Sequence, residues 1–112
     1  MRIAIPIAAG RLSAHFGHCE QFAIVDVDRE GKQIKEQQLL TPPAHEPGVL
    51  PAWLSGLNVN VVIAGGMGQR ALQLFAQNDI EVLCGAPSAK LEQLVSDYLE
   101  GRLALGQNVC DH

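Results

Sequence analysis

The segment "VNVVIAGGMGQRALQLFAQNDIEVLCG" (residues 59–85) predicts a strand, a helix and a second strand, in that order. "VNVVIAGG" ends a strand, "MGQRALQLFAQN" starts a helix, and "IEVLCG" is an apolar run of strand length. A helix that joins two strands of one sheet makes them a parallel pair with a right-handed crossover. The segment therefore predicts an α/β fold.

A further helix follows in "SAKLEQLVSDYLEG" (residues 88–101). Its apolar residues fall at i, i+3, i+4, i+7 and i+8, and they are Leu91, Leu94, Val95, Tyr98 and Leu99. Ser88 is the expected N-cap, and Gly101 is expected just beyond the C-terminal end.

The N-terminal half predicts three more strands, at residues 2–7, 22–28 and 32–40. "DREG" supplies the turn of an antiparallel hairpin between the last two. A short helix is expected around Pro51, since proline is tolerated in a first turn. Its apolar residues would share one face, namely Val49, Leu50, Trp53, Leu54 and Leu57. The whole chain, residues 1–112, is thus expected to be one α/β domain with a mixed five-stranded sheet flanked by helices.

This strand order also predicts where a ligand would bind. With strand 2–7 in the centre, the hairpin lies on one flank and the "VVIA" strand on the other. The loop 8–21 and the turn from Gly65 to Gly68 then leave the same edge of the sheet. Ligands of open α/β sheets bind at such carboxyl ends, beside a switch in strand order.

Composition limits the function. The 112 residues are 47% hydrophobic and 18% charged, which is typical of a folded globule. The net charge of −4 gives no general attraction to nucleic acid or to anionic membranes. No apolar run approaches the ~20 residues of a membrane span, and the N-terminus lacks a secretory pattern. We therefore expect a cytoplasmic protein with neither a nucleic-acid nor a membrane partner.

The glycine-rich turn "AGGMGQRA" (residues 64–71) opens a helix directly after a strand. Gly66 and Gly68 would let a ligand approach the backbone, the first helical N–H groups attract anions, and Arg70 adds a charge. A tight connection that needs glycine only for its dihedral angles explains the turn equally well. A dinucleotide fingerprint is unsupported, because Ala71 stands where its third glycine would be.

Soft metal ligands occur in two groups. His15, His18 and Cys19 form H-x-x-H-C, and Cys110 and His112 form C-x-H. Imidazole and thiolate bind zinc, copper and iron–sulfur species.

The alternative is a turn without a ligand, in which Phe16 and Phe22 fill the core and Gly17 makes the bend. Cys84 ends an apolar strand and is interpreted as a small core residue. His45 lies in a proline-rich loop that could face the same edge.

Two enzyme classes are unsupported. A two-metal nuclease needs carboxylates on central strands, and strand 2–7 has none. Asp26 and Asp28 lie in or beside the hairpin turn. The G-x-S-x-G elbow of serine hydrolases is absent.

The stretches "MRIAIP", "HFGHCEQF", "GGMGQRA" and "LFAQNDIEV", with the Gly, Asn and Cys of the ending, resemble the dinitrogenase iron-molybdenum cofactor biosynthesis family. This family contains NifX-like and NifB C-terminal-like domains. The resemblance implies a ribonuclease H-like fold without nuclease carboxylates, and the binding or carriage of anionic metal–sulfur clusters. "TPPAHEPGVLPAWL" and the final "CDH" favour the orange-protein branch, which holds a molybdenum–copper sulfide cluster, over a generic NifX-like carrier.

We therefore expect a non-enzymatic carrier or scaffold for a molybdenum–copper sulfide cluster, or for an iron–sulfur or FeMo-cofactor precursor. Helix dipole, hydrogen bonds and cations would attract the polyanion. The expected cofactor-binding residues are His15, His18, Cys19, His45, Gly66, Gly68, Arg70 and, as a second cation, Arg11. The expected metal ligands are His15, His18, Cys19, Cys110 and His112.

A protein that donates or accepts the cluster is the expected partner. Two alternatives remain open. One is a regulatory or interaction domain that has lost the site. The other is a simple zinc protein that uses Cys19, His15, His18 and Cys110.

Overall fold

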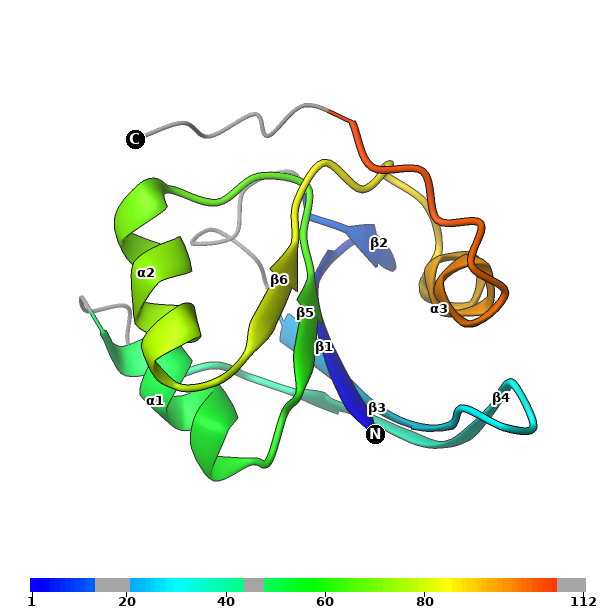
Figure 1. Ribbon diagram of the computed structural model, residues 1–112, viewed down its shortest axis with the longest axis horizontal. Coiled ribbons are helices and arrows are strands. Elements are labelled where there is room, and N and C mark those ends of the chain that lie inside the picture. Colours follow the sequence, from blue (N-terminus) through cyan, green and yellow to red (C-terminus); the bar gives the residue numbers. More distant parts are fainter. Residues whose placement is uncertain (14–20, 44–47, 107–112) are drawn as a thin grey trace.

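The computed structural model describes residues 1–13, 21–43 and 48–106 of the chain. Its strands and helices are shown in Figure 1. In chain order they are β1 (Arg2–Ala8), β2 (Arg11–Leu12), β3 (Gln21–Asp28), β4 (Gln33–Leu40), α1 (Val49–Gly56), β5 (Val61–Ile63), α2 (Gln69–Gln77), β6 (Glu81–Leu83) and α3 (Leu91–Leu99).

The sheet has the strand order β4-β3-β1-β5-β6, with β2 attached to β1. β1 is central, antiparallel to β3 on one side and parallel to β5 on the other. β3 and β4 form the antiparallel hairpin, and β5 and β6 form a parallel pair. The prediction of a mixed α/β sheet with a central first strand is confirmed. Its ribonuclease H-like label and the single-domain assignment stay predictions.

The sheet has six strands, whereas five were predicted. The additional strand is β2, which lies in the segment that was predicted to be a loop. Ala9 and Gly10 have φ angles of 54° and 77°, so they form the kind of two-residue turn that closes a hairpin. Leu12 therefore pairs with Ile7, and its N–H donates to the carbonyl of Ala89 at 3.1 Å. Two residues are too few for a periodic pattern, so no strand could be predicted here.

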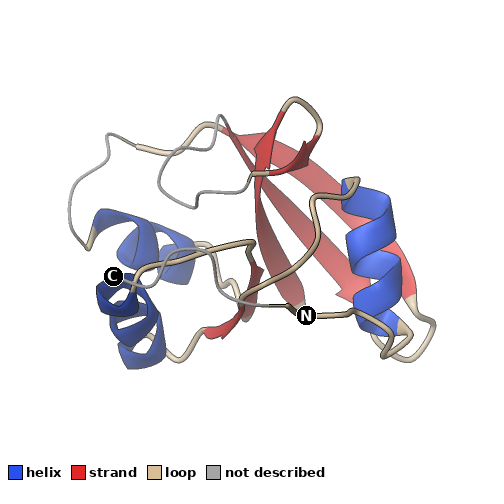
Figure 2. Ribbon diagram, turned by 90° about the horizontal axis from the view of Figure 1, so that it is seen from above, coloured by secondary structure: helices blue, strands red, loops and turns tan. Residues whose placement is uncertain are grey.

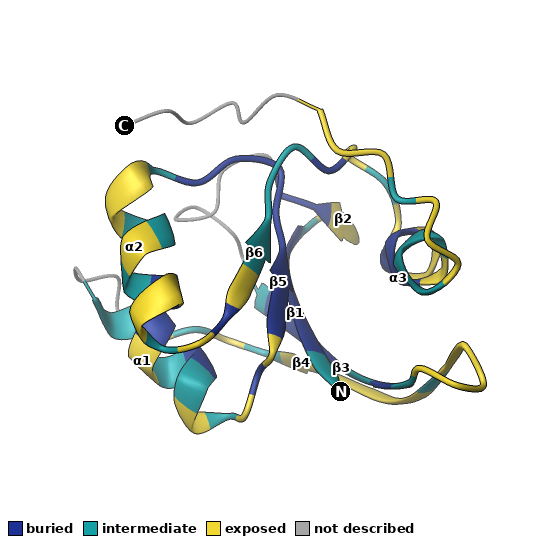
Figure 3. Cartoon of the chain, in the orientation of Figure 1, coloured by how far each residue is buried: buried dark blue, intermediate teal, exposed yellow. Residues whose placement is uncertain are grey.

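The sheet separates two helical layers, as seen from above in Figure 2. Alternate side chains of a strand point to opposite faces, so each central strand contributes to two apolar clusters. One cluster joins the sheet to α3 and includes Ile3, Ile5, Val25, Ile63, Leu94 and Val95. The other joins it to α1 and α2 and includes Ala4, Phe22, Ile24, Leu54, Val62 and Phe75. Figure 3 shows the resulting buried centre and the exposed outer side of α2.

Helix α1 packs as its sequence predicted. Pro51 lies in its first turn, and Leu50 and Leu54 are buried. The ring of Trp53 meets that of Phe22 edge to face, with centroids 5.7 Å apart. The apolar face of α1 thus fixes this helix against β3.

Helix α3 begins later than predicted. Its N-cap is Lys90, so the expected N-cap at Ser88 was wrong. Lys90 forms a β-bridge with Arg11, and this pairing keeps the backbone extended up to the first helical residue. The predicted stop is confirmed: Gly101 has a φ of 74°, and its N–H donates to the carbonyl of Tyr98 at 3.1 Å.

Within the described residues, none of the three helices is both long and apolar enough to span a membrane.

Candidate functional site

The strand ends define the candidate site. β1, β5 and β6 run parallel, so their carboxyl ends meet at one edge of the sheet. β4 also ends there, because Leu40 pairs with Phe22, which pairs with Pro6 near the end of β1. We call this region the carboxyl edge and the opposite end the amino edge.

The glycine-rich turn lies at the carboxyl edge, between β5 and α2. Gly66 is buried, and Gly68 is the N-cap of α2 in an extended conformation. No side chain among the described residues caps this helix, and its first turn contains no acidic residue. Uncapped N–H groups and the positive end of the helix dipole favour an anion. The predicted position of the turn is confirmed.

Arg70 lies in the first turn of α2 and is exposed. Its neighbours on the outward side of the helix are Gln73, Leu74 and Gln77, with which it lines a shallow depression. The guanidinium is therefore near the anion-attracting turn in sequence and open to solvent.

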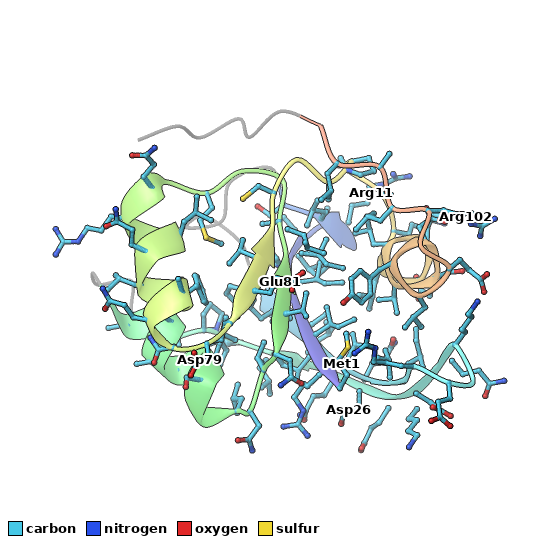
Figure 4. All side chains as sticks on the ribbon, viewed as in Figure 1. Met1, Arg11, Asp26, Asp79, Glu81 and Arg102 are labelled. Carbon is cyan, nitrogen blue, oxygen red and sulfur yellow. The ribbon has the colours of Figure 1, made fainter. Side chains whose placement is uncertain are left out.

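Arg11 points elsewhere. Its Nη1 donates to the carbonyl of Ser88 at 3.2 Å, on the way into α3. Figure 4 shows Arg11 on the α3 side of the molecule, whereas α2 lies on the other side. Among the described residues the two arginines do not converge on one point.

The other predicted site residues lie outside the described residues, in three segments. They are His15, His18 and Cys19 in 14–20, His45 in 44–47, and Cys110 and His112 in 107–112. The attachment points of these segments are nevertheless described.

All three segments start from the carboxyl edge. The N–H of Ser13 donates to the carbonyl of Pro6 at 2.8 Å, and Gln21 pairs with Ile7. Both ends of segment 14–20 are therefore attached beside the end of β1. Segment 44–47 follows the end of β4 by three residues.

The third segment leaves from Gly106. Its N–H donates to the carbonyl of Gly85 at 2.7 Å, just beyond the end of β6. The N–H of Gly85 in turn donates to the carbonyl of Gly65 at 2.9 Å. The sequence did not predict this arrangement, because the apolar residues of the C-terminal tail follow no helix or strand periodicity. Gly85 and Gly106 were the one sequence feature that could have indicated a close approach of the two backbones.

Cys84 also lies at the carboxyl edge. It is half-buried and packs against the apolar cluster beneath α1 and α2, as its interpretation as a core residue predicted. Across the described part of the chain, no three His, Cys, Asp or Glu side chains gather as a metal site.

The charges differ between the two edges. The described segments of the carboxyl edge contain Arg11 and Arg70 and no carboxylate; they are residues 8–13, 64–70, 84–88 and 103–106. The segments outside the description contain the acidic residues Glu20, Glu46 and Asp111.

The amino edge is held together around Arg2. Its Nε and Nη2 donate to the two carboxylate oxygens of Asp26 at 2.7 and 3.2 Å, and its Nη1 donates to the carbonyl of Leu57. Asn60 Oδ1 accepts from the backbone N–H of Arg2 at 2.8 Å. The hydrogen bond from Arg2 lowers the pKa of Asp26 below its ordinary 3.8, against the opposing effect of burial. At this edge, Arg2 and Asp26 are thus paired with each other.

Known proteins resemble the chain over nearly its whole length. The uncharacterized protein MJ0580 of Methanocaldococcus jannaschii is 35% identical over 108 residues, covering 92% of this chain and 89% of that protein. The crystal structure of PH0822 has a TM-score of 0.86 at 28% identity and covers 94% of both chains. The apo form of the orange protein from Desulfovibrio gigas has a TM-score of 0.74 at 20% identity, covering 96% of this chain and 93% of that one.

At 20% identity the likeness to the orange protein shows the fold alone. The family profile described as "Dinitrogenase iron-molybdenum cofactor" matches residues 1–101, which confirms the family predicted from the sequence. The chain belongs to the dinitrogenase iron-molybdenum cofactor family.

Proposed function

We propose that this protein is a non-enzymatic, cytoplasmic carrier or scaffold that binds an anionic metal–sulfur cluster at the carboxyl edge. The cluster is of the molybdenum–copper sulfide type or an iron–sulfur precursor of FeMo-cofactor. One observation carries the proposal: segments 14–20 and 107–112, which contain all five predicted metal ligands, are attached to the edge where the uncapped helix α2 begins. Segment 44–47, which contains His45, follows β4, and β4 ends at the same edge.

Chain connectivity supports this arrangement. An extended chain spans at most about 3.5 Å per residue. His15 follows Ser13 by two residues, and Cys19 precedes Gln21 by two. Cys110 follows Gly106 by four residues. Imidazole and thiolate groups from distant parts of the sequence are thus within reach of one edge.

The glycine-rich turn before α2 suits an anionic cluster whose metals are already bound by sulfide. Uncapped N–H groups at Gly68 and the first turn of α2 can donate hydrogen bonds, and Arg70 supplies positive charge. His15, His18 and Cys19 would add soft ligands for the metals. A protein that donates or accepts the cluster is the proposed partner.

The test is cluster loading of anaerobically purified protein. One sample receives tetrathiomolybdate with a copper salt, a second an iron–sulfur donor, and a third zinc. Metal content and the visible spectrum are measured after gel filtration. Retained molybdenum and copper with charge-transfer bands would support the orange-protein type, and retained iron and sulfide the precursor type.

Two results would reject the proposal. Retention of no metal–sulfur species from either donor would favour an interaction domain. Stoichiometric zinc bound by four N/S ligands in X-ray absorption, with neither cluster retained, would favour the zinc protein.

A further inference from the structure

The C-terminal segment 102–106 is held in place although it forms no helix or strand. Its start is fixed by the end of α3, where the N–H of Arg102 donates to the carbonyl of Asp97 at 2.7 Å. Leu103 then packs against the apolar cluster of the α3 face. Figure 1 shows the segment running from α3 over the carboxyl ends of β5 and β6.

The far end of the segment is fixed by Gly85. Backbone hydrogen bonds link Gly106 to Gly85 at 2.7 Å and Gly85 to Gly65 at 2.9 Å. They form a continuous row from the anion-attracting turn to the C-terminal segment.

Only glycine fits at position 85. Its φ is +85°, and a Cβ atom there would lie 2.1 Å from the carbonyl oxygen of Gly106. That atom belongs to backbone, so it cannot move aside as a flexible side chain would. Any side chain at this position would therefore displace the segment.

We propose that Gly85 is a positioning residue: its contact with Gly106 tethers the C-terminal segment to the carboxyl edge and slows release of the bound cluster. The tether holds residues 102–106 beside Gly85, which is itself hydrogen-bonded to Gly65 in the glycine-rich turn where the cluster is proposed to bind. Fixing a segment before a ligand binds reduces the conformational entropy lost on binding. This inference rests on the proposed function, because the cluster is the ligand retained.

A substitution at Gly106 can remove the hydrogen bond that forms the tether. Gly106→Pro removes the N–H that donates to Gly85. Gly106→Ala keeps this N–H, and its Cβ would make an ordinary contact, 3.5 Å from the carbonyl oxygen of Gly85. We expect the molybdenum–copper cluster to leave Gly106→Pro at least five times faster than the wild type, and Gly106→Ala to restore the rate to within twofold.

A second pair of variants tests Gly85 itself. Gly85→Ala introduces the clash with Gly106. Gly101→Ala is the matched control, because Gly101 has a similar φ of +74° and no atom within 4 Å of its added Cβ. Both variants carry backbone strain, and only Gly85→Ala is expected to speed cluster release.

Amide hydrogen exchange tests the tether without a cluster. We expect the Gly106 amide of the wild-type apo protein to be protected, and its protection to be lost in Gly85→Ala while the amides of β1 stay protected. An unprotected Gly106 amide in the wild type would overturn the tether. Equal release rates for Gly106→Pro and the wild type would also overturn it.

Failure of the proposed function gives a different result. In that case the wild type would retain no cluster, and Gly85 would have no role in retention whatever the exchange data show. Melting temperatures of the two Gly106 variants within a few degrees of each other would confirm that release reports the tether and not general unfolding.

Discussion

The two ends of the sheet are built in opposite ways. At the amino edge, side chains close the structure: Arg2 pairs with Asp26 through two hydrogen bonds and also binds the Leu57 carbonyl. At the carboxyl edge, backbone groups of glycines make the connections, and Gly85 links the turn at Gly65 to the C-terminal segment. The amino edge pairs Arg2 with Asp26, whereas the carboxyl edge offers backbone donors and the attachment points of ligand-bearing segments.

The two edges of the sheet therefore have different roles. Paired charges and side-chain hydrogen bonds add stability without leaving groups for a ligand. Glycines add no side chains, so neighbouring segments can approach the backbone closely. We therefore expect variants of the proposed ligands, of the linking glycines and of Arg70 at the carboxyl edge to change cluster binding, and variants of the Arg2–Asp26 pair at the amino edge to change stability.

The largest effect is expected when the predicted ligands of segment 14–20 are removed. The triple replacement of His15, His18 and Cys19 by alanine should weaken cluster retention at least tenfold, about 1.4 kcal/mol, because soft ligands are lost. Cluster retention is measured as the metal content of the protein after gel filtration. Cys84→Ala is the control, since this thiol packs against the core and is expected to leave retention unchanged. A triple variant that retains metal like the wild type would contradict the account.

A smaller effect is expected at the amino edge. Asp26→Asn removes a charge-assisted pair whose side chains are 31% and 33% exposed. The expected loss in the free energy of unfolding is about 1 kcal/mol, measured by urea denaturation. Cluster retention should stay at the wild-type level. A marked loss of retention would mean that the two edges are not separate.

The same ion pair predicts a pH dependence. The folded pKa of Asp26 lies below its ordinary 3.8, so its contribution to stability is fully present above that pH and is lost as the pH falls through the folded pKa. The stability difference between wild type and Asp26→Asn should therefore be constant from pH 7 to 5 and shrink below pH 4. A difference that grows on acidification would refute this assignment.

The smallest effect is expected for Arg70→Ala at the carboxyl edge. Arg70 is exposed, so its attraction for an anion is worth about 0.3–1 kcal/mol, a two- to fivefold change in cluster affinity. Added salt should reduce this change by screening. Lys35→Ala removes the same charge near the amino edge and should have no effect. Equal affinities of Arg70→Ala and wild type at low salt would remove Arg70 from the site.

Local sequence patterns predicted most of the fold. Short apolar runs and the glycine turn identified β5, α2 and β6, and the "DREG" turn identified the hairpin of β3 and β4. Strand β2 was missed because two residues are too few for a periodic pattern, and the N-cap of α3 was missed because it depends on a distant partner. Ser88 resembles an N-cap, yet Lys90 is held extended by its bridge to Arg11, which is 79 residues away in sequence.

The candidate site shows the same limit. The position of the turn at Gly66 and Gly68 followed from chain order alone. The direction of Arg11 did not, since it depends on the Ser88 carbonyl, and the bond from Gly106 to Gly85 joins residues with no shared pattern. Propensity describes neighbours in sequence, whereas these contacts arise only when the sheet is assembled.

The most direct test of the central claim is to locate the bound cluster by amide NMR. ¹⁵N-labelled protein is titrated with tetrathiomolybdate and a copper salt under anaerobic conditions. The account predicts that the amide signals of Ser13, Gly66, Gly68 and Gly106 change most, while those of Arg2, Asp26 and Val27 stay in place. Changes centred on the amino edge, or no changes at any amide, would contradict it.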